Sequence, residues 1–284
     1  MNAPDMPSDN DIWAPLRATT QARIGLGRAG NSLPTRRVLE FRAAHAAARD
    51  AVHDPLDVDG LIQRLHEIGI DDPLRVRSRA ASRSEYLRRP DLGRSPADLS
   101  NLPKIKADIG FVLADGLSPR ALTDHAAGTV DALVREFDNR YRIAPPVIAT
   151  QARVALGDHI GQALGVATVL VLIGERPGLS VADSLGIYLT HRPAPGLTDA
   201  DRNCISNIHP PDGLDYPTAA SVAAALVAGA RKLGRSGVAL KDTTRAGVGV
   251  ARSANAPAEI DRSTAGPRPS SRPAAGNHPA PRAD

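Results

Sequence analysis

Short apolar runs separated by polar, turn-forming segments mark the stretch from residue 104 to residue 241. Four of these runs, each four to seven residues long and almost wholly apolar, are Ile109–Ala114, Val147–Thr150, Ala167–Ile173 and Leu185–Thr190. Runs of this length and composition are typical of strands that are covered on both faces. The first ends in the turn-forming pair Asp115-Gly116. The pattern therefore predicts four strands in this stretch.

Helical signals occupy the segments between these runs. Ser118-Pro119 is a typical helix start, with Ser as N-cap and Pro in the first turn, and predicts a helix that runs to about Tyr141. Further helices are predicted at Arg153–Leu164 and at Thr218–Leu233. Strands and helices that alternate in this way predict an α/β fold with a mostly parallel sheet flanked by helices. The long segment between the fourth strand and the last helix is interpreted as a loop.

The N-terminal part of the chain has a different pattern. An Ala-rich helix is expected over residues 32–52 and a second helix over Val58–Ile68, whereas residues 75–94 hold seven arginines among few apolar residues. We interpret residues 19–103 as a helical arm that lies on the α/β domain or on another chain. The arginine-rich segment is expected to form salt bridges with a partner subunit.

The two ends of the chain are expected to lie outside the folded part. Residues 1–18 are interpreted as a flexible extension, because Pro15 and low helix propensity oppose a short helix there. Residues 242–284 are rich in Pro, Ser, Ala, Gly and Arg without any hydrophobic period, so they are predicted to be disordered. The α/β domain is thereby assigned to residues 104–241.

Composition excludes several classes of protein. Among 284 residues, 42% are hydrophobic and the net charge is only +4, so the chain can bury a core but lacks the basic surface of a nucleic-acid-binding protein. One cysteine excludes a disulfide framework and a cysteine-rich metal site. No apolar run approaches the roughly 20 residues that cross a bilayer, and the N-terminus is not a secretory signal. We expect a soluble, cytosolic protein with neither nucleic acid nor membrane as a partner.

One glycine motif resembles a dinucleotide-binding fingerprint. Gly25, Gly27 and Gly30 satisfy the pattern G-x-G-x-x-G. That chemistry requires a strand immediately before the glycines, and the preceding segment is polar and short. The fingerprint is therefore rejected as a dinucleotide site.

Three predicted strands end in polar or glycine-rich segments. These segments are Asp115–Ser118, Thr150–Arg153 and Gly174–Leu179. Because the ends of parallel strands meet at one edge of a sheet, their convergence there predicts a ligand site. Asp115, Gly116 and Arg176 are candidates from these loops.

The remaining reactive side chains give weaker signals. Cys204, with His209 five residues later, resembles a nucleophile and its base, but no third orienting group is evident, so a non-catalytic contact is favoured. No histidine spacing matches a metal site. The adjacent pairs Asp124-His125 and Asp158-His159 lie on predicted helices and are expected to face solvent.

Seven sequence segments, taken in their order along the chain, carry a resemblance to a known family. They are ARIGLGRAGNSLPT, FRAAHAAARDAV, YLRRPDLGR, LADGLS, RVALGDHIG, GERPGL and DRNCISNIH. Together, from about Thr19 to Lys241, the chain resembles the small subunit of ethanolamine ammonia-lyase, an adenosylcobalamin enzyme. The resemblance implies a Rossmann-like domain that holds one side of the cofactor against a large subunit, whose TIM-type barrel holds ethanolamine.

The resemblance also implies the chemistry and the contacts. In that family, homolysis of the cobalt–carbon bond begins a radical conversion of ethanolamine to acetaldehyde and ammonia. The cobalamin contacts correspond to Val154 in RVALGD, Glu175 in GERPGL and Cys204 in DRNCISN. No residue of this chain is assigned to catalysis or to a metal. Some relatives work in the open cytosol and others inside a protein-shelled microcompartment, and the sequence leaves both locations open.

Two other functions are compatible with the residues alone. One is a self-sufficient α/β hydrolase or transferase that uses Cys204 with His209. The other is a non-enzymatic binding module whose arginine-rich segment holds an anionic partner.

Overall fold

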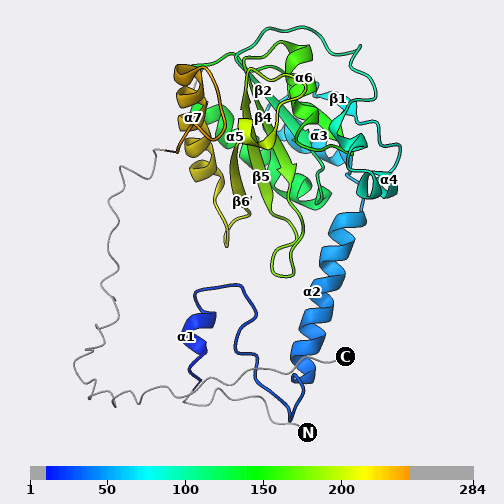
Figure 1. Ribbon diagram of the computed structural model, residues 1–284, viewed down its shortest axis with the longest axis vertical. Coiled ribbons are helices and arrows are strands. Elements are labelled where there is room, and N and C mark those ends of the chain that lie inside the picture. The colour runs from blue at the N-terminus through cyan, green and yellow to red at the C-terminus, as the bar shows by residue number, and fades with distance from the viewer. Residues whose placement is uncertain (1–10, 138, 243–284) are drawn as a thin grey trace, which may run out of the picture. The chain divides into compact units, whose positions relative to one another are not determined.

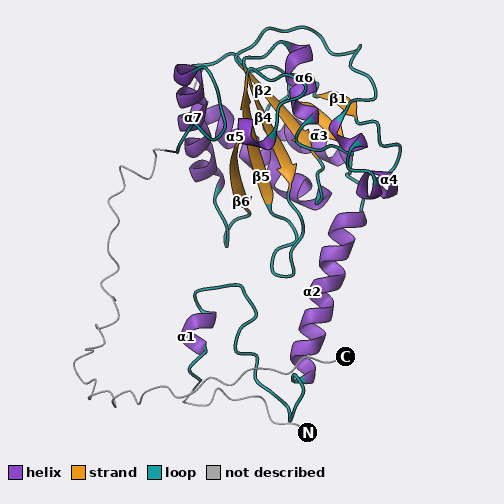
Figure 2. Ribbon diagram, in the orientation of Figure 1, coloured by secondary structure: helices purple, strands orange, loops and turns teal. Residues whose placement is uncertain are grey.

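The computed structural model describes residues 11–137 and 139–242. Its described part contains a six-stranded sheet in the order β1-β3-β2-β4-β5-β6 (Figures 1 and 2). The strands are β1 (Leu74–Arg77), β2 (Ile109–Ala114), β3 (Val147–Thr150), β4 (Thr168–Gly174), β5 (Leu185–His191) and β6 (Asn203–Ile208). The pairs among β1, β3, β2 and β4 are parallel, and the pairs β4–β5 and β5–β6 are antiparallel. The predicted α/β class with a mostly parallel sheet is confirmed, whereas the Rossmann-like topology stays a prediction.

Helices cover both faces of this sheet. The helices of the described residues are α1 (Ala14–Arg17), α2 (Thr35–His53), α3 (Val58–Glu67), α4 (Arg83–Arg88), α5 (Pro119–Phe137), α6 (Leu156–Leu164) and α7 (Tyr216–Leu233). Alternate residues of β2 point to opposite faces, as the period of a strand requires. Phe111 and Leu113 pack with α3, α5 and α7, whereas Val112 and Ala114 pack with α6. Two apolar cores therefore hold the sheet between layers of helices.

The ends of β2 and β4 approach each other closely beside the candidate site. Gly116, which follows β2, has a φ of +55°, and a Cβ at this position would lie 2.2 Å from the backbone oxygen of Gly174. Only glycine adopts this backbone without strain and leaves room for the β4 backbone. This close backbone contact sets the spacing between the loops that follow β2 and β4.

The N-terminal arm is shorter than predicted, because the sheet begins before residue 104. Leu74–Arg77, inside the stretch 19–103 that was interpreted as a helical arm, forms β1 and pairs in parallel with β3. In this strand only Val76 is buried, while Arg75 and Arg77 are exposed. An edge strand needs few apolar residues, so the surrounding arginines hid its pattern.

The predicted loop around Cys204 is also a strand. Asn203–Ile208 forms β6 at the other edge of the sheet, with Ile205 and Ile208 buried. Its remaining residues are polar or exposed, which made the segment resemble a loop. The helix expected to run to Tyr141 ends at Phe137.

The first described residues form little regular structure. A single turn, α1, lies inside the extension that was predicted to be flexible, because Pro15 is tolerated in the first turn of a helix. Gly25, Gly27 and Gly30 lie in irregular backbone with no strand before them. Of the nineteen residues of α2, only Ala51 is buried. The predicted disordered tail, apart from Asp242, lies outside the described residues. Within the described part, no helix has the length and apolar character needed to span a membrane.

Candidate functional site

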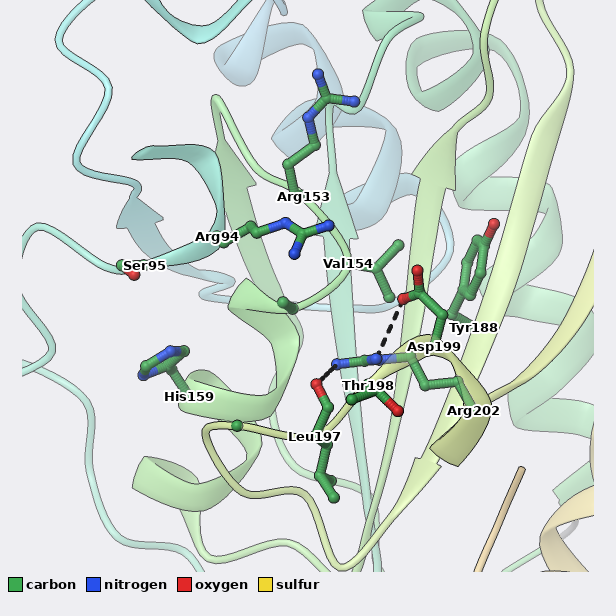
Figure 3. Close-up of a pocket in the computed structure, with 12 residues that line it drawn as sticks. Arg94, Ser95, Arg153, Val154, His159, Tyr188, Leu197, Thr198, Asp199 and Arg202 are labelled. Atoms are coloured by element: carbon green, nitrogen blue, oxygen red, sulfur yellow. Dashed lines mark hydrogen bonds and ion pairs between the residues drawn. The ribbon is translucent and has the colours of Figure 1, made fainter. Parts of the chain in front are cut away.

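Several cavities lie at the edge where the parallel strands end, and two of them contain predicted contact residues. The larger, of about 670 Å³, is lined by Arg94, Arg153, Val154, His159, Tyr188 and Arg202, among others (Figure 3). The smaller, of about 420 Å³, is lined by Gly116, Arg153, Val154, Glu175, Arg176 and Tyr188, among others. Because Arg153, Val154 and Tyr188 line both, the two cavities adjoin. Two of the three predicted contacts, Val154 and Glu175, therefore lie in one cavity.

Glu175 links three strands at this edge. Its Oε2 accepts a hydrogen bond from the Ser184 hydroxyl at 2.5 Å and another from the Asn207 backbone N–H at 3.3 Å. Its backbone N–H donates to the Ser184 carbonyl at 2.9 Å. Oε1 lies over Gly186, where a Cβ would be only 2.9 Å away. These contacts hold a half-buried carboxylate beside the smaller cavity, where it can accept hydrogen bonds from a ligand.

The third predicted contact, Cys204, reaches the same cavity through Tyr188. The two residues are cross-strand partners on β5 and β6, so their side chains lie beside each other on one face of the sheet. The residue is exposed, but its neighbours partly desolvate the thiol. Burial raises the pKa of the Cys204 thiol, the charge of Glu175 adds to this, and the neighbouring Tyr188 hydroxyl opposes it. The thiol is therefore protonated at neutral pH.

The alternative nucleophile–base pair is not favoured by this geometry. The ring Nε2 of His209 is hydrogen-bonded at 2.8 Å to the side-chain oxygen of Asn207, whereas Cys204 lies opposite Tyr188 on the neighbouring strand. A nucleophilic cysteine requires a lowered pKa and a base within hydrogen-bond reach. Neither condition is met among the described residues.

Arg153 is held between the two cavities by an aromatic ring. Its guanidinium lies 4.6 Å from the centre of the Tyr86 ring, within the range of a cation–π contact. Tyr86 is fully buried, and its hydroxyl donates to the Ala152 carbonyl at 3.0 Å. The Arg153 backbone N–H donates to Gly93. Tyr86 and Gly93 of the arginine-rich segment thus support the site from within this chain, and the contact of its arginines with a partner subunit stays a prediction.

Asp115 connects strand ends instead of facing the cavities. Its carboxylate accepts the backbone N–H groups of Gln151 and Ala152 at 2.7 and 2.8 Å, and Arg83 lies 3.5 Å away. Burial raises the pKa of Asp115 to about 6, although these donors and Arg83 oppose the shift. The residue therefore joins the ends of β2 and β3 and positions the loop that carries Arg153.

Two residues that were expected to face solvent are buried. Asp158 forms a buried ion pair with Arg202, which also contacts Asp199 at 3.2 Å. Burial raises the pKa of Asp158, and the arginine opposes the shift. His125 is likewise buried, with its Nδ1 2.9 Å from the Tyr216 hydroxyl. Adjacent Asp-His pairs gave no sign of this, because the partners come from distant segments.

Sequence reasoning missed Tyr188, Arg94 and Arg202 as lining residues. Tyr188 lies in an apolar run that was interpreted as core, yet it is only partly buried. Its side chain is the one polar group in that run of leucine, isoleucine and glycine before Thr190. Arg94 was grouped with six other arginines, and nothing in the sequence distinguished it from them.

These features define an α/β protein with an open, polar ligand site at the carboxyl edge of its sheet. Among the described residues, no group of three His, Cys, Asp or Glu side chains is placed to hold a metal ion. The site offers apolar, amide-accepting and cationic groups, so it is suited to hold a large ligand instead of supplying a nucleophile.

Comparison with known proteins identifies the family. The chain belongs to the ethanolamine ammonia-lyase light chain family (EutC), whose sequence model matches residues 10–241. It is 69% identical to the ethanolamine ammonia-lyase small subunit of Rhodococcus erythropolis over 235 residues, which covers 83% of this chain and 91% of the relative. The small subunits of Rhodopseudomonas palustris and Azotobacter vinelandii are 49% and 46% identical, with 80% and 83% of this chain and 88% and 90% of those relatives covered. The resemblance inferred from the seven sequence segments is confirmed.

Proposed function

We propose that the carboxyl edge of the sheet is the small-subunit side of an adenosylcobalamin site, completed by a large subunit that holds ethanolamine. The observation that carries this proposal is that Val154 and Glu175 line one cavity and that Cys204 is the cross-strand partner of Tyr188, which lines the same cavity. The complex would convert ethanolamine to acetaldehyde and ammonia. This chain would act only as part of that complex, free in the cytosol or inside a protein-shelled compartment.

The residues fit a corrin, which is a broad, mostly apolar ring with amide side chains at its rim. Val154 and the ring of Tyr188 offer apolar contact. Glu175 already accepts two hydrogen bonds at Oε2, and its Oε1 is placed to accept an amide N–H from a ligand. A protonated Cys204 thiol adds a small apolar contact and does not attack the ligand. Gly116 leaves the backbone of the edge without a side chain.

The bound cofactor would supply a cobalt–carbon bond that cleaves homolytically, and the protein's part is binding and orientation. Glu175 would fix the rotation of the ring by accepting an amide hydrogen. Val154, at the start of α6, would set the depth of the ring against the sheet. Ser184 and the Asn207 backbone would hold Glu175 in place for this task. No described residue of this chain is assigned a proton transfer.

The visible spectrum of the purified complex tests the proposal. We expect the chain co-expressed with a large subunit to bind adenosylcobalamin and to show corrin absorption after gel filtration, and the chain alone to be inactive. A complex that forms but does not retain corrin would overturn the proposal.

The variant Glu175→Ala tests the assigned contact. A hydrogen bond to a charged acceptor contributes about 1.5–3 kcal/mol, so the complex should bind the cofactor roughly 10–100-fold more weakly. The KM for ethanolamine should change little. Glu175→Gln keeps an acceptor for the Ser184 hydroxyl and should lose less cofactor affinity than Glu175→Ala. The control is Glu67→Ala, at an exposed position at the end of α3. Unchanged cofactor affinity in Glu175→Ala removes this residue from the site.

A further inference from the structure

The larger cavity carries an excess of positive charge. Three arginines and one histidine line it, namely Arg94, Arg153, Arg202 and His159, against one carboxylate, Asp199 (Figure 3). The corrin contacts assigned above need no positive charge, because the rim amides of the ring are neutral. The cations therefore require a separate explanation.

The charge of Arg202 is balanced within the chain. Its side chain is 2% exposed, forms ion pairs with Asp158 and Asp199, and donates to the Leu197 carbonyl at 3.1 Å (Figure 3). Its Nε is nevertheless buried without a hydrogen-bond partner. Arg202 therefore adds no unbalanced charge to the cavity.

The charges of Arg94 and Arg153 are not balanced. In the part of the chain that the structure describes, neither side chain forms an ion pair. The Arg153 guanidinium lies 4.6 Å from the centre of the Tyr86 ring, and its buried Nε has no hydrogen-bond partner. Figure 3 shows the Arg94 side chain reaching toward Val154 across the cavity. Arg94 is exposed and Arg153 is half-buried, so both guanidinium groups are available to pair with an anion in the cavity.

The start of α6 adds a partial positive charge to this wall. Val154 and Ala155 line the cavity immediately before the helix, and no side chain caps its N-terminus. The N–H groups of Leu156, Gly157 and Asp158 already donate to the carbonyls of the preceding turn, so the helix contributes its dipole and not free N–H groups of its first turn. Guanidinium groups beside the positive end of a helix dipole are a typical environment for phosphate.

We propose that this cavity binds the phosphodiester of the nucleotide arm of adenosylcobalamin, with Arg94 and Arg153 as its cationic ligands. The inference rests on the proposed function, because it extends the same ligand from the smaller cavity into the adjoining one. Arg153, Val154 and Tyr188 line both cavities, so one ligand can occupy the two. The phosphodiester is the anionic group of that cofactor, and it matches the charge that the cavity leaves unbalanced.

Comparison of two corrins tests this inference on the complex with its large subunit. Adenosylcobinamide retains the ring but lacks the nucleotide arm and its phosphodiester. We expect Arg94→Gln to weaken the binding of adenosylcobalamin by about tenfold or more, as for other charge-assisted hydrogen bonds, and to leave the binding of adenosylcobinamide unchanged. Arg94→Lys should retain part of the affinity. Equilibrium binding is followed by the corrin spectrum.

Arg88→Gln is the matched control, since Arg88 is an exposed arginine of the same segment and lies outside both cavities. It should leave the affinity for both corrins unchanged. Because the Arg94 side chain has no ion pair or hydrogen bond in the described chain, its variants should unfold at the same temperature as the unmodified protein. A lowered Tm would mean that the loss of cofactor affinity reflects a change in the fold and not the loss of one contact.

The outcomes separate this inference from the proposed function. If the unmodified complex binds neither corrin, the proposed function fails. If it binds both and Arg94→Gln changes neither affinity, the function stands and the phosphodiester site is overturned.

Titration with inorganic phosphate distinguishes the source of the anion. If phosphate competes with adenosylcobalamin but not with adenosylcobinamide, the cavity binds the phosphodiester of the cofactor. Phosphate binding that depends on Arg94 without affecting the cofactor overturns it in favour of a free anion.

Discussion

Single side chains at the sheet edge divide into those that hold the edge together and those that face the cavities. Asp115 belongs to the first group, because its carboxylate accepts two backbone N–H groups from the segment after β3. Arg83 extends the same network to the Gly116 carbonyl at 2.8 Å and to the Val52 carbonyl at 2.8 Å. Glu175 belongs to both groups, since it joins β4 to β6 and faces the smaller cavity.

The buried Asp115 predicts a pH effect on stability. Burial raises its pKa from 3.8 to about 6, so the folded protein binds this proton more tightly than the unfolded chain does. The favourable contribution is complete below about pH 4 and is lost as the pH rises through about 6. Relative to Asp115→Asn, the unmodified protein should therefore lose roughly 1–3 kcal/mol of stability between these pH values.

Urea unfolding of both proteins at several pH values measures this difference. Other titrating groups cancel in the comparison, because both proteins contain them. A difference in unfolding free energy that stays constant from pH 4 to pH 7 would show that Asp115 has the same pKa in both states.

At the scale of elements, the site depends on how closely strand ends and helix starts approach. The backbone after β2 touches the end of β4 at Gly116. Helix α5 starts directly after this contact, and α6 starts after β3. Residues from loops that lie far apart in the chain meet here, and their spacing depends on one backbone contact. A small change at this contact should therefore affect stability and the site together.

Gly116→Ala should destabilise the protein by about 2–5 kcal/mol. A positive φ costs an alanine roughly 1–2 kcal/mol, and the clash of its Cβ with the Gly174 oxygen adds about 1–3 kcal/mol. Gly234→Ala is the control, because Gly234 also has a positive φ, of +75°, but nothing lies within 4 Å of its Cβ position. In thermal unfolding, the Tm of Gly116→Ala should lie well below that of Gly234→Ala. An equal loss of Tm in both variants would show that the backbone around Gly116 shifts to accept the new Cβ.

At the scale of the whole molecule, the chain presents surfaces that it does not cover by itself. Its described residues place the two cavities at an open sheet edge, and α2 buries one residue in nineteen. Leu39 and Phe41 of this helix are 58% and 45% exposed. An open ligand site and an uncovered helix are what a subunit of a larger enzyme presents, in agreement with the family to which the chain belongs.

The one cysteine of the chain reports on how the site is covered. The raised pKa of Cys204 predicts slow alkylation by iodoacetamide at pH 7 and faster reaction as the pH rises above 9. In the complex loaded with adenosylcobalamin, the rate at this residue should fall at least tenfold. Mass spectrometry of the peptide that contains Cys204 separates it from thiols of the large subunit. Equal rates in the free chain and the loaded complex would place the cofactor elsewhere.

The sequence by itself determined the elements of the core, the family and the residues proposed to contact the cofactor. Continuous apolar runs such as Ile109–Ala114 can be satisfied only by burial on both faces, so their pattern is unambiguous, and the segments around Val154 and Glu175 carry the family resemblance. These signals are local, because each is contained in a few consecutive residues.

Only the tertiary structure decided what the polar and charged residues do. The edge strands Leu74–Arg77 and Asn203–Ile208 bury few side chains, so their sequences resemble loops until they pair with a neighbour. Asp158 is buried because Arg202, 44 positions away in the chain, lies against it. Likewise, Arg94 is the arginine of its segment that lines the larger cavity with Val154. A charge acquires its role from partners that are distant in sequence, and folding alone brings those partners together.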